Sequence, residues 1–242
     1  MRLILTLLML LLCENIFCMN IEGHDAIAQN GYRFWVAVPD DTTSAKPLVI
    51  FLHGASLRGT DLNRVKRYGT INALEKGVDL DAFVVAPQVV SGSWDVAKVN
   101  DILEWTEQNY KIDSDRVYVL GMSLGGHGTL EFASTYPDKI AAAIAICGGN
   151  INGDISRLTE VPLWIIHGTA DKAVRISHSD RLVDNMKKIC PSVPRLRYTR
   201  LKGVNHSRPA RLFYNPKIYK WLFSHRLSDD GRPVGESFPL SL

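Results

Sequence analysis

Arg116-Val117-Tyr118-Val119-Leu120 leads straight into Gly121-Met122-Ser123-Leu124-Gly125, and a run of small residues with helical character follows. A strand, a Gly-x-Ser-x-Gly motif and a helix in this order are typical of a nucleophile elbow, a tight turn that holds the serine strained and pushes its hydroxyl clear of the backbone. Glycines flank the serine because the helix must pass close to the neighbouring strands. This stretch therefore predicts that Ser123 is the nucleophile of a serine hydrolase.

Length and composition are those of a globular protein. The chain has 242 residues, of which 46% are hydrophobic and 22% are charged, with a formal net charge of +3. Chains of 200 to 250 residues with alternating strands and helices commonly form one domain. We therefore predict a single domain over residues 19–242.

Residues 1–18 have the pattern of a secretory signal peptide. Arg2 supplies a positive start, and Leu3 to Leu12 form an apolar run broken only by Thr6. This run is too short to span a bilayer, so we predict cleavage near Met19 and export to the periplasm or the outside of the cell. Lipid attachment at Cys13 is the alternative, although the leucine just before this cysteine fits lipoprotein cleavage poorly.

Apolar runs bounded by Gly, Pro and Asp alternate with helical periodicity along the rest of the chain. The predicted strands are Tyr32–Val38, Leu48–Leu52, Phe83–Ala86, Val117–Leu120, Ala142–Ile146, Leu163–Ile166 and Leu196–Leu201. The predicted helices are Leu62–Lys76, Asp95–Asn109, Leu124–Tyr136, Ser179–Lys188 and Pro216–His225. Most central strands are apolar at every position, as strands covered on both faces are. The order predicts an α/β fold, a mainly parallel open sheet with helices on both faces.

Two polar residues follow later strands, where they could meet the serine. Four residues separate Asp171 from the end of Leu163–Ile166, and four residues separate His206 from the end of Leu196–Leu201. A serine hydroxyl needs a base that a third group orients, and reacting groups of open α/β sheets collect at the carboxyl ends of the strands. We therefore predict His206 as the base and Asp171 as the orienting acid.

Other acids and histidines compete for these two roles. None of the rival acids directly follows a strand, and His225 ends a predicted helix, where a histidine interacts favourably with the helix dipole. The remaining histidines near the motifs are interpreted as packing or loop-supporting residues. The rivals are Asp154, Asp180 and Asp184 for the acid and His24, His178 and His225 for the base, and the supporting histidines are His53, His127 and His167.

The negative oxygen of a tetrahedral intermediate needs hydrogen-bond donors. One is expected from the backbone N–H of Leu124, directly after the nucleophile, and one from the loop after Leu48–Leu52, where we favour the N–H of Ala55. Gln88 and Trp94 flank a Ser-Gly-Ser stretch near the expected pocket rim. They are predicted to contact substrate, although Trp94 could equally anchor the helix that follows.

The predicted mature chain keeps two cysteines, Cys147 and Cys190, on different elements. Sequence leaves their pairing open, and we expect two separate thiols. The sequence contains no His-x-x-x-His or Cys-x-x-Cys spacing, so no metal site is predicted.

Taken together, the motifs resemble the α/β-hydrolase superfamily, in particular its small secreted esterases of the predicted-peptidase, phospholipase/carboxylesterase and feruloyl-esterase-like groups. The resembling residues are Leu52-His53-Gly54, Arg58-Gly59-Thr60-Asp61, Gly121–Gly126, His167–Asp171 and Val204-Asn205-His206. The resemblance implies a Ser123, His206 and Asp171 triad that needs no cofactor. The chain departs from the family pattern in two places. Little length precedes Tyr32, so the first strand is expected to be short or missing, and only about sixteen residues separate Cys147 from Leu163, so no inserted lid is expected.

Charge is distributed unevenly along the chain. From Asn185 to Ser228 there are eleven Lys or Arg residues and no Asp or Glu, and His206 lies within this segment. The segment is either an ordinary solvated surface or a mouth that attracts anionic esters. Nucleic acid is not expected as a partner, because no recognition motif is present.

These features predict an exported serine esterase that acts through an acyl-enzyme on acylated carbohydrates or small esters. One alternative is a serine peptidase of the prolyl-oligopeptidase type, although such proteins usually gate the site with an extra domain for which this chain has no room. The other is a non-catalytic binding module on a hydrolase scaffold. The sequence leaves the acyl group, the alcohol and the oligomeric state open.

Overall fold

The computed structural model describes residues 20–234 and residue 240, and the predicted signal peptide lies outside this range. Eight strands form one sheet in the order β1-β2-β4-β3-β5-β6-β7-β8. The strands are β1 (Asn20–His24), β2 (Arg33–Val38), β3 (Lys46–Leu52), β4 (Phe83–Gln88), β5 (Ile112–Met122), β6 (Ala142–Ile146), β7 (Leu163–Gly168) and β8 (Leu196–Leu201). Strands β3 to β8 pair in parallel, whereas β2 is antiparallel to both of its neighbours.

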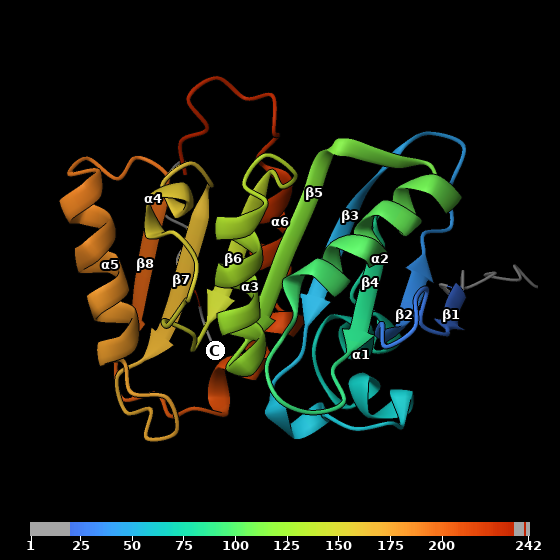
Figure 1. The fold of residues 1–242 in the computed structure, drawn as a ribbon, viewed down its shortest axis with the longest axis horizontal. Helices are drawn as coiled ribbons and strands as arrows, with labels where there is room; N and C mark the ends of the chain where they lie inside the picture. Colours follow the sequence, from blue (N-terminus) through green and yellow to red (C-terminus); the bar gives the residue numbers. More distant parts are fainter. Residues whose placement is uncertain (1–19, 235–239, 241–242) are drawn as a thin grey trace, which may run out of the picture.

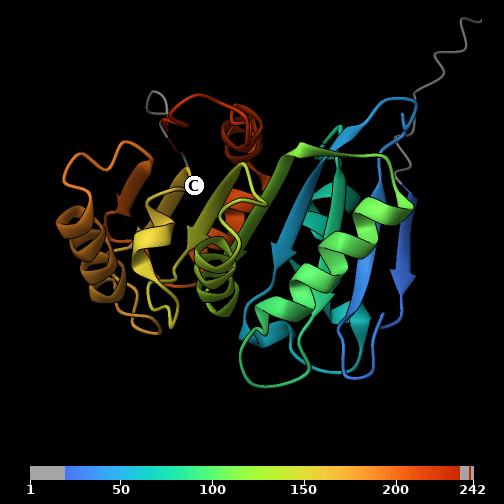
Figure 2. The same ribbon diagram turned by 45° about the horizontal axis from the view of Figure 1, so that its top comes forward.

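Helices cover both faces of this sheet (Figures 1 and 2). The helices are α1 (Thr70–Glu75), α2 (Val96–Asn109), α3 (Leu124–Thr135), α4 (Ile155–Leu158), α5 (Ser177–Ile189) and α6 (Pro216–Phe223). Apolar residues of α2, α3 and α5 belong to one buried cluster, and those of α1 and α6 belong to a second cluster on the opposite face. The predicted α/β-hydrolase architecture is therefore confirmed.

The strand β3 shows why the central strands are apolar throughout. Leu48, Ile50 and Leu52 pack into the cluster beneath α2 and α3. Val49 and Phe51 point the other way, into the cluster beneath α1 and α6. Because successive side chains of a strand alternate between the two faces, a strand between two helical layers buries every residue.

The predicted helix Leu62–Lys76 is wrong, because two elements occupy it. A 3₁₀ helix, η2, spans Leu62–Arg67, and α1 begins only at Thr70. Gly69 separates them with a φ of +97°, and a Cβ at this position would lie 2.0 Å from the Phe51 ring. The backbone at Gly69 lies against the Phe51 ring in the core, and only glycine fits there. Helical periodicity gives no sign of this contact.

Four short elements were not predicted. They are the edge strand β1, the helix α4, and the 3₁₀ helices η1 (Ala55–Leu57) and η3 (Arg208–Tyr214). β1 has five residues, which agrees with the expectation of a first strand that is short or missing. Neither Cys147 nor Cys190 forms a disulfide. Across residues 20–234 and 240, the helices lack the length and apolar character needed to cross a membrane.

Candidate active site

Ser123 lies in the sharp turn between β5 and α3. Its φ of 59° and ψ of −118° are strained for a residue other than glycine. Two features fix the turn: the Ser123 N–H donates to Ile146 O at 2.8 Å, and Gly125 brings α3 against β3. A Cβ on Gly125 would lie 1.8 Å from Leu52 O, so only glycine allows this approach. The geometry is that of a nucleophile elbow.

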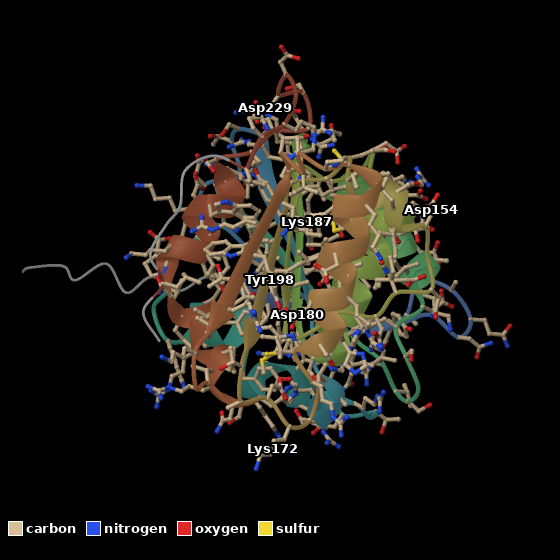
Figure 3. All side chains as sticks on the ribbon, turned by 90° about the vertical axis from the view of Figure 1, so that its left-hand side faces the viewer. Asp154, Lys172, Asp180, Lys187, Tyr198 and Asp229 are labelled. Carbon is tan, nitrogen blue, oxygen red and sulfur yellow. The ribbon has the colours of Figure 1, made fainter. Side chains whose placement is uncertain are left out.

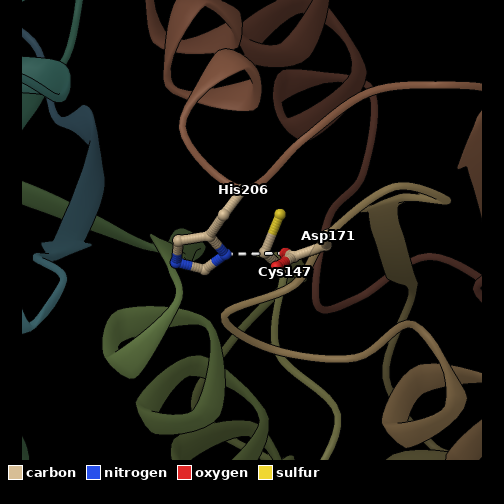
Figure 4. Close-up of side chains that lie close together, drawn as sticks. All are labelled: Cys147, Asp171 and His206. Carbon is tan, nitrogen blue, oxygen red and sulfur yellow. Dashed lines mark hydrogen bonds and ion pairs between the residues drawn. The ribbon is translucent and has the colours of Figure 1, made fainter.

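His206 and Asp171 reach Ser123 from the loops that follow β8 and β7. His206 Nε2 lies 2.9 Å from Ser123 Oγ, and His206 Nδ1 lies 2.6 Å from Asp171 Oδ2. Figure 4 shows the imidazole directed at the carboxylate. Because the carboxylate can only accept, Nδ1 carries the proton and Nε2 is left to accept from the serine hydroxyl. The structure thus joins, in one hydrogen-bonded chain, the three side chains that the sequence singled out.

The Asp171 carboxylate is buried, and both of its oxygens accept hydrogen bonds. Its Oδ1 accepts from the N–H groups of Ala173 and Val174, each at 2.9 Å. Burial by itself would raise the pKa of Asp171, but the hydrogen bonds from His206, Val174 and Ala173 outweigh it and hold the pKa below its ordinary value. The carboxylate is therefore ionised at neutral pH and can stabilise a protonated His206.

Two further residues contact this acid, and sequence analysis did not assign them to the site. His167 Nε2 lies 3.2 Å from Asp171 Oδ2, and its Nδ1 lies 2.8 Å from Ser179 Oγ. Cys147 directly follows β6, and its sulfur lies within 4.8 Å of ligand atoms of Asp171 and His206 (Figure 4). Burial, together with the charge of Asp171, raises the pKa of the Cys147 thiol to about 12. The thiol is therefore protonated at neutral pH.

The rival acids have other partners. Asp154 caps the start of α4 by accepting from the Ser156 N–H at 2.8 Å. Asp180 accepts from the Tyr198 hydroxyl at 2.8 Å, and Figure 3 shows this pair between α5 and β8. Both carboxylates are thus held by local contacts.

The two expected oxyanion donors lie free beside the nucleophile. Leu124 begins α3, and Ala55 begins η1 on the loop after β3. Within the described part of the chain, neither backbone N–H donates to a protein acceptor. The Ala55 loop is close to the elbow, because a Cβ on Gly54 would lie 3.6 Å from Ser123 Cβ. Two N–H groups near one serine can bind the negative oxygen of a tetrahedral intermediate.

The buried side chain of His53 holds the loop that carries Gly54 and Ala55 through hydrogen bonds. The Val89 N–H donates to its Nε2 at 3.2 Å, so Nδ1 carries the proton and donates to Gly54 O at 2.7 Å. Burial lowers the pKa of His53 to about 4, and the charges of Arg58 and Arg64 act in the same direction. A neutral ring is what this pair of hydrogen bonds requires.

The residues Gln88 and Trp94 occupy different environments. Gln88 is 2% exposed, and its amide donates to Leu57 O at 2.9 Å and to Asp61 O at 2.8 Å. Trp94 donates to His53 O at 3.2 Å and borders a pocket of about 240 Å³ beside Leu124. The other residues around this pocket are Ser93, His127, Gly128, Glu131, Asn150 and Asn152. The pocket is small, its surface is polar and apolar in similar measure, and His127 lines it.

Comparison with known proteins agrees with this geometry. Residues 96–221 match the phospholipase/carboxylesterase family model, and the chain belongs to this family. The resemblance expected from the motifs is thus confirmed.

Three individual relatives share less than a third of their aligned residues with this chain. A bifunctional acetylxylan esterase/xylanase of Neocallimastix patriciarum is 28% identical over 203 residues, which cover 79% of this chain and 28% of that protein. Feruloyl esterase D of Neurospora crassa is 26% identical over 168 residues, which cover 63% of this chain and 57% of that protein. A solved structure of a thermostable esterase superposes with a TM-score of 0.72 at 28% identity and covers 86% of this chain and 63% of its own. The chain spans less than two thirds of each of these relatives.

Proposed function

We propose that the protein is a serine esterase that uses Ser123, His206 and Asp171 to hydrolyse carboxylic esters. The hydrogen-bonded chain from Asp171 through His206 to Ser123 carries the proposal. Such a chain activates a hydroxyl that is otherwise a weak nucleophile at neutral pH.

In the proposed reaction, Ser123 Oγ attacks the ester carbonyl while His206 Nε2 takes its proton. Asp171 holds the imidazole in the required tautomer, and the N–H groups of Leu124 and Ala55 bind the oxyanion. The protonated His206 then donates to the leaving alcohol, and a water molecule activated by the same imidazole releases the acid. Every step uses groups of this chain and water, so the reaction requires no cofactor.

Acylated carbohydrates and small esters are the proposed substrates. The pocket beside Leu124 supports this choice, because Ser93, Glu131 and Asn152 offer both donors and acceptors to hydroxyl groups. The names of the acetylxylan and feruloyl esterase relatives point in the same direction. We also propose that residues 1–18 direct export and are removed, leaving one catalytic domain over 19–242. N-terminal sequencing of the secreted protein tests this point.

The test of function combines a covalent probe with a substrate panel. A fluorophosphonate probe is expected to label the wild-type protein and not Ser123→Ala. Acetyl, methyl, feruloyl and longer-chain esters of sugars and uronates, together with aminoacyl-proline amides, then separate an esterase from a peptidase. Asp171→Asn is expected to lower kcat about 10⁴-fold, because an amide favours the wrong tautomer of His206. Asp154→Asn is the matched control, and a wild-type protein that takes up no probe would favour the binding module.

A further inference from the structure

Tyr68 lies beside the nucleophile, although it comes from a different part of the fold. It follows η2 and immediately precedes Gly69, whose left-handed backbone turns the chain into α1. Its ring packs against the apolar cluster beneath α1 and α6, and the side chain is half-buried. The side chain is therefore held in place while part of it faces the solvent.

The Tyr68 hydroxyl is bonded on one side only. Its oxygen accepts from the Gly54 N–H at 3.0 Å. No residue among 20–234 and 240 accepts the hydroxyl proton. A tyrosine hydroxyl both accepts and donates, so this one retains an unused donor. The bond that it accepts polarises the hydroxyl and strengthens the hydrogen bond that it can give.

This donor faces the same space as Ser123. A Cβ placed on Gly54 would lie 2.6 Å from Tyr68 Oη and 3.6 Å from Ser123 Cβ, so both groups border the same side of the glycine. The next residue along is Ala55, whose free N–H is a proposed oxyanion donor. The Tyr68 hydroxyl thus lies on the side of Gly54 that faces the nucleophile, next to the loop that carries the Ala55 N–H.

We propose that the Tyr68 hydroxyl is a third donor to the oxyanion of the tetrahedral intermediate. The proton stays on the tyrosine throughout, and the hydrogen bond strengthens as negative charge develops on the carbonyl oxygen. The inference rests on the proposed esterase function, because the oxyanion exists only if Ser123 attacks an ester. It assigns a catalytic role to a residue that no sequence motif indicates.

The test compares Tyr68→Phe with Tyr214→Phe. Tyr214 is the matched control, because its hydroxyl already donates to Asn72 Oδ1 at 2.6 Å. With an aryl acetate, Tyr68→Phe is expected to lower kcat about 10- to 100-fold and to leave KM within about threefold, because the lost hydrogen bond is strong only in the transition state. The affinity for a trifluoromethyl ketone, which forms a tetrahedral adduct with an oxyanion, should fall by the same factor.

Other results would overturn the proposal. If Tyr68→Phe keeps kcat within twofold of the wild type, the hydroxyl does not bind the oxyanion. If kcat falls while the affinity for the ketone is unchanged, the hydroxyl does not bind the oxyanion. In both cases the wild-type protein remains an esterase. A wild-type protein that hydrolyses no ester and takes up no fluorophosphonate overturns this inference together with the proposed function.

Discussion

His167 Nε2 lies 3.2 Å from Asp171 Oδ2, and both side chains are fully buried. The same nitrogen lies 2.9 Å from Val174 O. Both of these oxygens can only accept, so Nε2 carries a proton. The His167 N–H donates to Val174 O and lies next to Asp171 Oδ2, whereas the His206 N–H donates to this carboxylate oxygen directly. The buried carboxylate is therefore held by His206 and lies beside a second polar N–H group.

Removing the His167 donor should change the pH dependence of the reaction. His167→Leu leaves more negative charge on Asp171 Oδ2, and this charge stabilises the protonated form of His206. We expect the acid limb of the kcat/KM profile to move to higher pH. His167→Gln, which can keep the donor, should stay close to the wild type. Profiles measured between about pH 4 and pH 9 check this, and an unmoved limb in His167→Leu would show that His167 supports the loop only.

The contact between α3 and β3 should tolerate no side chain at Gly125. In Gly125→Ala the new Cβ would meet Leu52 O, a backbone atom that cannot turn aside. We expect a loss of more than about 3 kcal/mol in the free energy of unfolding, or no folded protein. Gly77→Ala is the control, because Gly77 has a φ of +86° but no atom within 4 Å of the added Cβ. It should cost about 1 to 2 kcal/mol in urea unfolding, and equal costs for the two variants would contradict the prediction.

Stability should fall in mild acid because of His53. The ordinary pKa of this side chain is 6.5, whereas burial lowers the pKa to about 4 in the folded protein. Between these values the unfolded chain binds more protons than the folded chain, so stability decreases as the pH falls from about 6.5 to about 4. The full effect is on the order of 3 kcal/mol.

Urea unfolding of the wild type and of His53→Gln at several pH values measures this contribution. The variant should be less stable at pH 7 but should lose less stability on acidification. The slope should decrease rather than vanish, because burial also lowers the pKa values of His127 and His225. Identical slopes for the two proteins would rule out His53 as a source.

The basic segment around His206 allows a test of substrate charge. Arg208 and Arg211 are exposed on η3, and with Asn205 and Ser207 they line a hollow beside the base. If they attract anionic esters, kcat/KM for a uronate-bearing ester should fall more steeply with salt than that for its neutral analogue.

Substitution of both arginines by glutamine should lower kcat/KM for the anionic ester about three- to tenfold and leave kcat/KM for the neutral ester unchanged. Lys187→Gln on α5 is the control, because this lysine is exposed at the other end of that helix from the site (Figure 3). Equal salt dependence for both esters would identify the segment as an ordinary solvated surface.

Much of the scaffold follows from patterns within single elements. Apolar runs located seven of the eight strands, and the Gly-x-Ser-x-Gly motif predicted the elbow because its small residues and strand-to-helix order are local features. Asp171 and His206 could be selected because the carboxyl ends of parallel strands meet at one edge. The strand β1 was missed because five residues at an exposed edge bury too little to show a pattern.

The surroundings of the reacting groups depend on contacts between distant segments. His206 and Ser123 are 83 residues apart, Tyr68 reaches Gly54 across 14, and His167 meets Asp171 only through the fold of the loop after β7. Periodicity indicates whether a residue lies on the buried side of its own helix or strand. It does not indicate which atoms of other segments that residue contacts. The positions of the strands along the chain and the identity of the reactive side chains are therefore encoded locally. Which donors face the carboxylate and the oxyanion depends on how loops from β3, η2, β7 and β8 pack at the edge of a twisted sheet.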